Sequence, residues 1–352
     1  MVNVAVLGYG VVGSGVVELI DNNNAIFSEK LGQPIDVKYI LDIRDFKGDK
    51  YEKKLIRDFS VIENDPEISV VVETIGGIGA AYDFTKRALT AGKNVVTSNK
   101  ELVATHAPEL LILARQKGVS YLFEASVGGG IPIIRPMFYC LAANEINKIV
   151  GILNGTTNYI LTKMIYEKTP FDKALVQAQK LGYAEADPTA DIDGHDTCRK
   201  ICILAALAFG RHVYPECVYT KGIRDITLDD ISKADAHGRV IKLLGSAKKL
   251  ENGDIEIFVS PCAIRKTHAL ANIEDVYNGI MVTGDAVGDV TFNGRGAGKF
   301  PTASAVCSDV IDAARDSIQY SIFWKDEGRD FIRSFEDIKF NYLPGTDIPV
   351  IE

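Results

Sequence analysis

Short apolar runs alternate with segments of helical periodicity through the N-terminal third of the chain. Residues 2–7, 37–41, 70–77 and 94–97 have the apolar character and length of buried strands. Apolar positions at helical spacing follow the first run, and a further helix is expected near residues 80–91. Strands that alternate with helices form a parallel sheet covered by helices. The predicted fold class is therefore α/β, with a doubly wound parallel sheet.

The pattern changes near residue 130, where a glycine-proline stretch interrupts the alternation. A passage out of the first sheet is expected there. Beyond it the sequence predicts a strand at 146–152, a turn at 154–158 and the beginning of a helix at 159–165. Later apolar runs predict antiparallel strands of a second, α+β domain, at 255–259, 280–284 and 289–293.

A second glycine-rich helix start lies far downstream, at residues 294–305. We expect it to open a helix that runs to about Tyr320 and returns the chain to the first domain, which is then discontinuous. The expected domains are a nucleotide-binding domain at 1–135 and about 295–320, a substrate-binding and dimerisation domain at 136–294, and a C-terminal tail at 321–352.

The first predicted strand runs into Gly8-Tyr-Gly-Val-Val-Gly13 and then into a helix. Gly8 permits a tight turn, Gly10 lets the backbone approach a pyrophosphate, and Gly13 allows the helix to pack closely on the strand. The N-terminus of the helix then faces the phosphates. This order predicts a Rossmann-type dinucleotide site. The alternative is a glycine turn in a domain of this kind that has lost its nucleotide.

Charge and composition narrow the class of partner. The 352 residues carry a net charge of -8 and no long basic block, which argues against binding to nucleic acid or an acidic membrane. The apolar run at 201–209 is too short to cross a bilayer, and the N-terminus lacks a secretory pattern. Six cysteines without a C-x-x-C pair suit reduced thiols. We expect a cytoplasmic protein whose partners are small molecules and further copies of the chain.

Residues 183–200 carry five carboxylates before a lysine, a density that costs self-repulsion unless a cation or a charged ligand relieves it. Asp196 and Lys200 project from one face of a helix. The alternative is a surface ion pair worth about 0.3 to 0.5 kcal/mol. A calcium loop is excluded because Lys200 takes the place of its final Glu, and a zinc site at the neighbouring histidine and cysteines lacks a fourth ligand. We predict a site for an amino-bearing ligand, drawing on Glu185, Asp187, Asp191, Asp193 and Asp196.

Lysine is a suitable proton donor for carbonyl reduction. The reaction needs a hydride donor, a proton for the developing alkoxide and groups that hold the substrate, and lysine is protonated at neutral pH. Lys200 and Lys100 are candidates. Lys100 lies just beyond the carboxyl end of a parallel strand, where open α/β sheets bind ligands; the alternative there is a solvated loop lysine.

Six segments of the chain, in a fixed order, carry a family resemblance. They are Gly8-Tyr-Gly-Val-Val-Gly13, Thr97-Ser-Asn-Lys100, Phe123-Glu-Ala-Ser-Val-Gly-Gly-Gly-Ile-Pro132, Gly151-Ile-Leu-Asn-Gly-Thr-Thr-Asn-Tyr-Ile160, residues 183–200 and Gly294-Arg-Gly-Ala-Gly298. Together they resemble the homoserine dehydrogenase family and cover most of residues 1–320. The resemblance implies reversible NAD(P)H-dependent reduction of L-aspartate 4-semialdehyde to L-homoserine, in the route to threonine and methionine. We also expect a homodimer.

Carried over by position, the resemblance gives Lys200 the role of proton donor and Asp196 that of binding and orienting the reacting end of the substrate. Glu185, which would hold the substrate ammonium, and Asp191 complete the site, and Lys100 lies beside the substrate and nicotinamide. A monovalent cation, Na⁺ or K⁺, would bind largely through backbone oxygens in a stretch that is otherwise a hinge, at Glu124, Val127, Gly129 and Ile131. The expected cofactor contacts are Gly8, Gly10, Val12, Gly13, Arg44, Ser98, Lys100 and Gly298.

The choice between NAD and NADP depends on two neighbouring residues. Asp42 could accept a ribose hydroxyl, whereas Arg44 could bind a 2'-phosphate; Arg44 matches the family position better, which favours NADP without excluding NAD. About thirty residues follow the final predicted helix, too few for the ACT domain of many bacterial members, so we expect no threonine regulation of that kind. The rival hypotheses are a non-catalytic nucleotide-binding sensor and a dehydrogenase of another amino-acid semialdehyde.

Overall fold

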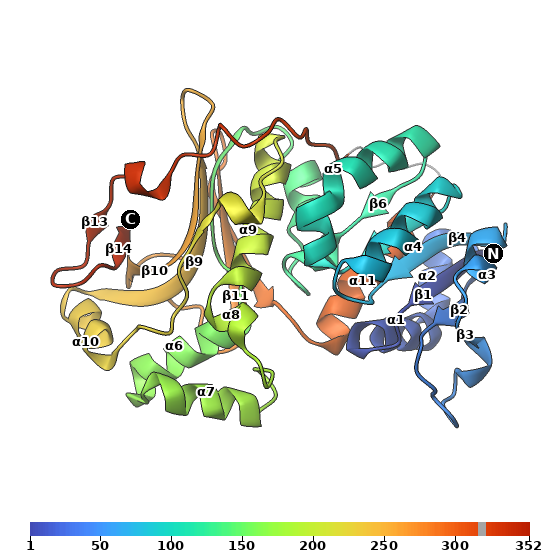
Figure 1. The fold of residues 1–352 in the computed structure, drawn as a ribbon, viewed down its shortest axis with the longest axis horizontal. Coiled ribbons are helices and arrows are strands. Elements are labelled where there is room, and N and C mark those ends of the chain that lie inside the picture. The colour runs from blue at the N-terminus through green and yellow to red at the C-terminus, as the bar shows by residue number, and fades with distance from the viewer. Residues whose placement is uncertain (316–321) are drawn as a thin grey trace. The chain divides into compact units, whose positions relative to one another are not determined.

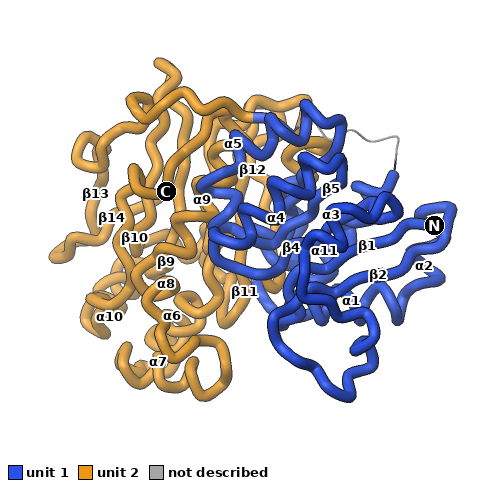
Figure 2. The backbone as a smooth tube through the Cα atoms, turned by 45° about the vertical axis from the view of Figure 1, so that its right-hand side comes forward, with its two compact units in different colours: residues 1–134, 297–323 blue, residues 135–296, 324–352 orange. Residues whose placement is uncertain are grey.

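The computed structural model describes residues 1–315 and 322–352, which form two compact units. Unit 1 contains Met1–Ile134 and Ala297–Phe323, and unit 2 contains Arg135–Gly296 and Trp324–Glu352 (Figure 2). Each unit is therefore assembled from two separate stretches of the chain.

Unit 1 is built on a six-stranded parallel sheet with the order β3-β2-β1-β4-β5-β6. The order reverses between β1 and β4, which confirms the doubly wound arrangement. The strands are β1 (Val2–Leu7), β2 (Ile35–Leu41), β3 (Leu55–Ile56), β4 (Ile68–Glu73), β5 (Asn94–Thr97) and β6 (Tyr121–Leu122). The helices around this sheet in Figure 1 are α1 (Val11–Asn22), α2 (Asn24–Leu31), α3 (Ser60–Asn64), α4 (Gly79–Thr90), α5 (Lys100–Lys117) and α11 (Lys299–Ala313).

The late helix α11 packs against the first helix of the chain. A Cβ on Gly15 of α1 would lie 3.1 Å from the Cβ of Ala303, so the absence of a side chain lets the two helices approach closely. Val16 and Val306, on these helices, are fully buried in the same apolar core as strand β1. Burial of this apolar surface ties the late stretch to the start of the chain.

Unit 2 contains an eight-stranded mixed sheet, with the order β12-β11-β7-β9-β10-β14-β13 and β8 beside β10. Its pairs are antiparallel except those of β10 with β8 and β14. The strands are β7 (Ile146–Ile152), β8 (Tyr219–Thr220), β9 (Arg239–Lys249), β10 (Ile255–Arg265), β11 (Tyr277–Gly284), β12 (Gly288–Arg295), β13 (Asn341–Tyr342) and β14 (Pro349–Ile351). The helices are α6 (Gly155–Glu167), α7 (Phe171–Lys180), α8 (Thr189–Ile192), α9 (His195–Phe209) and α10 (Leu228–Ala236).

Two sequence predictions within unit 2 need correction. The turn expected at residues 154–158 is the start of α6, because the Asn154 side chain accepts a hydrogen bond from the Thr157 N–H and caps the helix. Strand β9 is absent from the sequence prediction, since Lys242 and Gly245 interrupt its apolar pattern. Residues that look like loop or surface in the sequence are thus placed at the centre of this unit.

The C-terminal part of the chain also differs from expectation. The helix expected to run to about Tyr320 ends at Ala313 in the structure, and Tyr320 lies outside the described residues. Of the C-terminal tail expected at residues 321–352, residues 324–352 belong to unit 2 and supply β13 and β14 to its sheet. The pairing of β14 with β10 explains why this segment is held to the unit.

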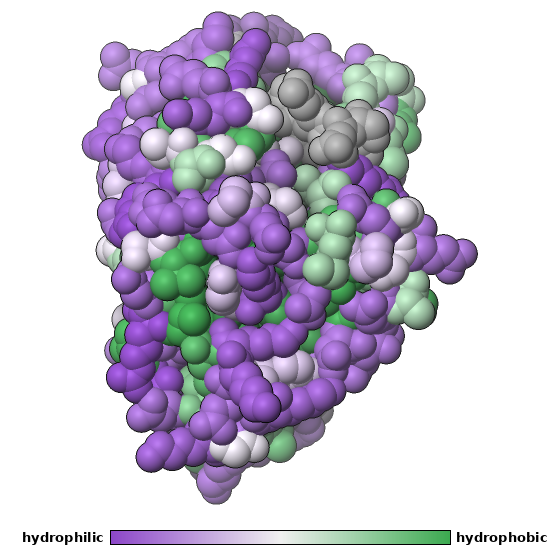
Figure 3. All heavy atoms as spheres, turned by 90° about the vertical axis from the view of Figure 1, so that its right-hand side faces the viewer, coloured by the Kyte–Doolittle hydropathy of each residue, from purple (hydrophilic) through white to green (hydrophobic). Residues whose placement is uncertain are grey.

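None of the helices in the described part of the chain is long and apolar enough to cross a membrane. The face drawn in Figure 3 is mostly hydrophilic, with apolar side chains in limited patches. All six cysteines are free thiols, and four of them are buried.

One lysine is enclosed in the sheet of unit 2. Lys242, on β9, is 1% exposed, and its Nζ donates to Asn158 Oδ1 at 3.1 Å and to the Ile273 carbonyl at 2.6 Å. Burial lowers the pKa of Lys242 to about 8. The ammonium thus ties the segment before β11 to helix α6, against a cost of desolvation.

Stability should depend on pH through Lys242. Its folded pKa of about 8 lies below the ordinary lysine value, so the unfolded chain binds more protons between the two, and this group's contribution to stability rises with pH through that window. The free energy of unfolding of the wild type, minus that of Lys242→Met, should therefore increase by on the order of 1 to 3 kcal/mol from about pH 7 to about pH 10. Urea unfolding of both proteins measures this; a difference independent of pH would contradict it.

Candidate active site

Strand β1 and helix α1 meet at a tightly packed glycine turn. Gly8 has a φ of +90°, in the left-handed region that favours glycine. A Cβ on Gly13 would lie 1.9 Å from the Gly8 carbonyl oxygen, so α1 can approach β1 only with glycine there. Val12 is half-buried in the first turn of α1. At Gly10, which caps α1, a Cβ would meet no atom within 4 Å, so the start of the helix borders open space where it can receive an anion.

An arginine neutralises the carboxylate that follows β2. Asp42 is buried, and its Oδ2 accepts hydrogen bonds from the Tyr9 N–H at 2.7 Å and from Arg44 Nη2 at 2.8 Å. Its Oδ1 accepts from the backbone N–H and the Nε of Arg44 at 2.9 and 3.0 Å. The Arg44 guanidinium lowers the pKa of Asp42 to about 2. Since the Arg44 side chain is 57% exposed, the accessible charge at this strand end is positive.

Two other segments of unit 1 carry predicted cofactor residues. Ser98 and Lys100 flank Asn99, whose side chain accepts hydrogen bonds from two N–H groups in the first turn of α5 and donates to the Gly77 carbonyl at 2.6 Å. Lys100 is therefore the first residue of α5, three residues beyond the end of β5. Gly298, with a φ of +120°, caps α11. The carboxyl edge of the sheet and two helix starts thus carry the predicted cofactor residues.

The predicted catalytic pair lies in a buried cluster in unit 2. Gly194, with a φ of +86°, precedes α9, which places Asp196 in the first turn, where the helix dipole favours a carboxylate. Lys200 Nζ donates to Asp196 Oδ2 and to the Leu153 carbonyl, both at 2.8 Å. Asp196 and Lys200 are 2% and 7% exposed, so the surface ion pair that the spacing allowed is the wrong interpretation.

Asn154 joins a second carboxylate to this pair. Its Nδ2 donates to Asp191 Oδ1 at 2.7 Å and to Asp196 Oδ2 at 2.9 Å. Burial, and then the charge of Asp196, raise the pKa of Asp191. Reasoning from the sequence missed Asn154 as a site residue. The available signal was its position at the end of a strand, directly before a Gly-Thr-Thr helix start.

The other carboxylates of the acidic stretch have separate surroundings. Glu185 is exposed on the segment between α7 and α8. Asp187 accepts a hydrogen bond from the Thr189 N–H at 3.1 Å at the start of α8, and Asp193 forms an ion pair with Arg224. The five carboxylates therefore do not form one cluster, and much of the repulsion expected from the sequence is relieved by local partners.

The stretch expected to bind a monovalent cation is buried in unit 1. Glu124 Oε1 accepts hydrogen bonds from two consecutive backbone N–H groups, of residues 133 and 134, at 2.6 and 2.9 Å. One carboxylate with backbone oxygens is a donor set that suits a hard cation. Within residues 1–315 and 322–352, no group of three or more His, Cys, Asp or Glu side chains could hold a metal ion. The other expected ligands are Val127, which is buried, Gly129, with a φ of +56°, and Ile131, also buried.

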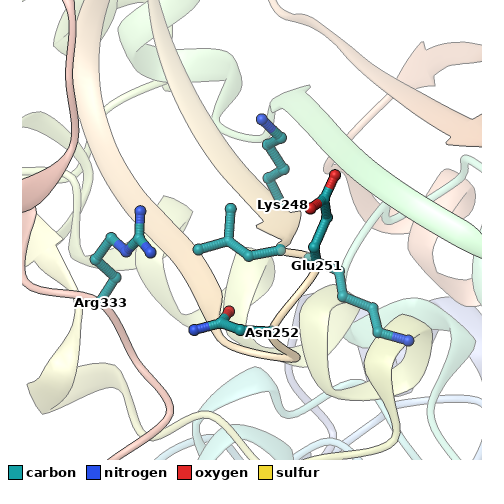
Figure 4. Close-up of a pocket in the computed structure, with 6 residues that line it drawn as sticks. Lys248, Glu251, Asn252 and Arg333 are labelled. Carbon is teal, nitrogen blue, oxygen red and sulfur yellow. The ribbon is translucent and has the colours of Figure 1, made fainter.

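A separate hollow of about 560 Å³ lies at the turn between β9 and β10 (Figure 4). None of the predicted site residues lines it, so it is distinct from the Asp196 and Lys200 cluster. Five of its six lining residues are polar or charged, and the full set is Lys248, Lys249, Leu250, Glu251, Asn252 and Arg333.

A dinucleotide turn in one unit and a buried lysine paired with a carboxylate in the other are the features expected of a nicotinamide-nucleotide-dependent dehydrogenase. Two family models match the chain: the NAD-binding domain of homoserine dehydrogenase over residues 8–124, and homoserine dehydrogenase over residues 132–311. The chain belongs to the homoserine dehydrogenase family. It is accordingly an NAD(P)-dependent oxidoreductase that acts on a CH–OH group.

Known homoserine dehydrogenases are similar to this chain, in sequence and in structure, over most of its length. The homoserine dehydrogenase of Synechocystis is 46% identical over 318 residues, which are 88% of this chain and 73% of that protein. A homoserine dehydrogenase structure from Thiobacillus denitrificans has a TM-score of 0.86 at 38% identity and covers 99% of this chain and 79% of its own. A hyperthermophilic archaeal homoserine dehydrogenase in complex with NADPH has a TM-score of 0.74 at 28% identity. The match covers 89% of this chain and 97% of that one. These findings support a nicotinamide nucleotide as the cofactor.

Proposed function

We propose that this chain catalyses the reversible NAD(P)H-dependent reduction of L-aspartate 4-semialdehyde to L-homoserine, in amino-acid biosynthesis. The observation that carries the proposal is the buried Lys200 ammonium, held between Asp196 and the Leu153 carbonyl in the part of the chain that matches the homoserine dehydrogenase model. A non-catalytic nucleotide sensor would gain nothing from such a pair, whose desolvation costs several kcal/mol per ion.

Reduction of the aldehyde needs a hydride, which the nicotinamide supplies when it is bound, and a proton. Lys200 holds the proton at Nζ and gives it to the carbonyl oxygen as negative charge develops there. Asp196 accepts a hydrogen bond from the same Nζ and fixes the direction of the ammonium. In the reverse reaction Lys200 must be neutral, because it takes the hydroxyl proton of homoserine.

The amino-acid end of the substrate is assigned to acidic side chains. Asp191 shares the Asn154 amide with Asp196, so its carboxylate faces the same cluster. Glu185 is assigned to the substrate ammonium, and its exposure leaves the carboxylate accessible to a ligand. Lys100, in unit 1, is assigned a place beside the substrate and nicotinamide on the family resemblance alone.

We favour NADP as the cofactor. Both oxygens of Asp42 are engaged by Tyr9 and Arg44, whereas a ribose 2'-hydroxyl needs an acceptor oxygen. The exposed Arg44 guanidinium offers N–H donors to a 2'-phosphate. The open space at Gly10 leaves room for the pyrophosphate. The remaining proposed contacts are Gly8, Val12, Gly13, Ser98, Lys100 and Gly298.

Three further assignments rest on the sequence and the family resemblance. The chain is assigned to the cytoplasm and to a homodimer. Na⁺ or K⁺ is assigned to the stretch from Glu124 to Ile131, where the buried Glu124 carboxylate would supply one oxygen and the backbone the others.

Replacing Lys200 by alanine should lower L-homoserine turnover by about 10² to 10⁴, because a positioned acid is lost. Lys200→Arg keeps the charge but should be equally slow, since a guanidinium does not release its proton in a protein. Lys163→Ala, which removes a lysine paired with Glu167 on α6, is the control and should keep activity. Spectrophotometric formation of reduced nicotinamide measures all four proteins. Near-normal turnover in Lys200→Ala would refute the assigned role.

Homoserine oxidation by the wild type should rise from neutral toward alkaline pH. Only neutral Lys200 can accept the hydroxyl proton, and lysine is mostly protonated near neutrality. Initial rates with saturating L-homoserine, measured across the pH range, test this. A flat wild-type profile would count against Lys200 as the proton acceptor.

Arg44→Ala should move the cofactor preference from NADP toward NAD. Loss of hydrogen bonds between a charged donor and phosphate, worth about 1.5 to 3 kcal/mol, corresponds to about a 10- to 100-fold lower kcat/KM with NADP. The value with NAD should hold or rise, since Asp42 becomes available to the ribose. Arg87→Ala, which removes an arginine paired with Glu63, is the control and should leave the ratio unchanged. An equal loss with both cofactors would show that Arg44 does not discriminate between them.

A further inference from the structure

Asn154 occupies the junction between β7 and α6, and its side chain is at the centre of the buried cluster. It is 5% exposed. Its Oδ1 accepts hydrogen bonds from the Thr157 N–H at 2.9 Å and the Thr157 hydroxyl at 3.0 Å. Its Nδ2 donates to both Asp191 and Asp196. One amide group thus caps a helix with its oxygen and binds two carboxylates with its nitrogen.

The chemistry of the neighbours fixes which way this amide points. The Thr157 N–H can only donate, so the atom facing it must be the amide oxygen. Ionised carboxylates can only accept, so the atom facing Asp191 and Asp196 must be the amide nitrogen. Reversing the amide would leave repulsive contacts at both ends. The helix cap therefore sets the orientation in which the N–H donors reach the carboxylates.

The N–H donors of Asn154 also affect Lys200, because both residues donate to the same oxygen of Asp196. Asp196 Oδ2 accepts from Asn154 Nδ2 and from Lys200 Nζ, while the preceding residue, Leu153, supplies the second acceptor for that Nζ. A hydrogen bond to a carboxylate stabilises its charged form and restrains its direction. Asn154 thus restrains the Asp196 oxygen that binds the ammonium, and it holds Asp191 beside it without adding charge.

We propose that Asn154 is a positioning residue for the reaction: its neutral amide holds Asp191 and Asp196 together and thereby sets the direction and proton affinity of Lys200. This inference rests on the proposed function, because it takes Lys200 as the proton donor. Asn154 itself needs no contact with the substrate. The titratable groups that face it are Asp191 on α8 and Asp196 and Lys200 on α9; Lys242 on β9 binds Asn158, one turn further along α6.

Asn154→Asp keeps an oxygen that can cap the helix but removes the amide N–H donors. Aspartate caps helices about as well as asparagine, so α6 should keep its start. The nitrogen, however, becomes an oxygen that faces two carboxylates, and the added negative charge raises the proton affinity of the whole group. At low pH the introduced carboxyl group is protonated and again offers a donor, now an O–H. Activity in the reducing direction should therefore be lost near neutrality and recover on acidification.

The expected result is a 10- to 1000-fold lower kcat/KM for Asn154→Asp in aldehyde reduction near pH 8, by comparison with the loss of a positioned group. The ratio of the variant's kcat/KM to that of the wild type should then rise by about 10- to 100-fold from about pH 8 to about pH 6, because each pH unit above the pKa of a carboxyl group lowers its protonated fraction about tenfold. Asn154→Ser, which keeps a cap oxygen but adds no charge, should be slow without this acid rescue.

Thr157→Val is the matched structural control. It removes the hydroxyl that donates to Asn154 Oδ1 but leaves the backbone N–H and the Asn154 donors in place. It should lower stability in urea unfolding more than it lowers kcat/KM, and its pH profile should follow the wild type. Urea unfolding of Asn154→Asp shows whether its folded fraction is constant over the pH range used.

The outcomes separate this inference from the proposed function. If the wild type fails to turn over L-homoserine with either cofactor, the proposed function is wrong. If the wild type turns over and Asn154→Asp matches it in rate and pH profile, the positioning role alone is wrong. A loss of activity in Asn154→Asp that is independent of pH, with a folded protein, would also overturn the inference, since a neutral donor would then not be the property that matters.

Discussion

A buried ammonium that must stay hydrogen-bonded is the constraint on which the centre of unit 2 depends. Removing two charges from water costs several kcal/mol each, and only good geometry with further hydrogen bonds offsets that cost. For Lys200 the geometry comes from Asp196 on the same helix and from the Leu153 carbonyl at the end of β7. The carbonyl is within reach because Gly245 on β9 lacks a side chain: a Cβ there would lie 3.0 Å from Ile201 of α9 and 3.2 Å from Leu153.

Glycine has the same spacing role in unit 1. A side chain at Gly13 would collide with the Gly8 carbonyl, and one at Gly15 would press on Ala303 of α11. Helix α1 is thereby brought onto the sheet with its N-terminus at the carboxyl edge, where dinucleotide sites form. In both units, then, a glycine without a Cβ sets the position of a helix that carries predicted site residues. In unit 1 the glycines are on that helix, α1; in unit 2 the glycine is on β9, against which α9 packs. The dinucleotide turn of unit 1 and the buried lysine of unit 2 differ in chemistry, but both require close packing at a glycine.

The sequence predicted those parts of the fold in which local pattern and burial agree. The strands at Val2–Leu7, Asn94–Thr97 and Ile146–Ile152, and the helix that begins near His195, match the structure because apolar side chains there face the core. Strand β9 could not be predicted from local pattern, because the burial of its Lys242 depends on Asn158 and Ile273, which are far away in the chain. A polar residue whose partners come from distant segments carries no local signal of burial.

The acidic stretch shows the same limit at the level of the site. Its charge density drew attention to residues 183–200, but that density does not say which of the carboxylates lie together. Asp193 is balanced by Arg224 and Asp187 by a helix start, while Asp191 and Asp196 are brought together by an amide outside the stretch. The raised pKa of Asp191 reflects its burial and then the proximity of Asp196. What makes two of these carboxylates a pair is therefore their common donor, Asn154, and a sequence pattern built on charge alone has no way to include it.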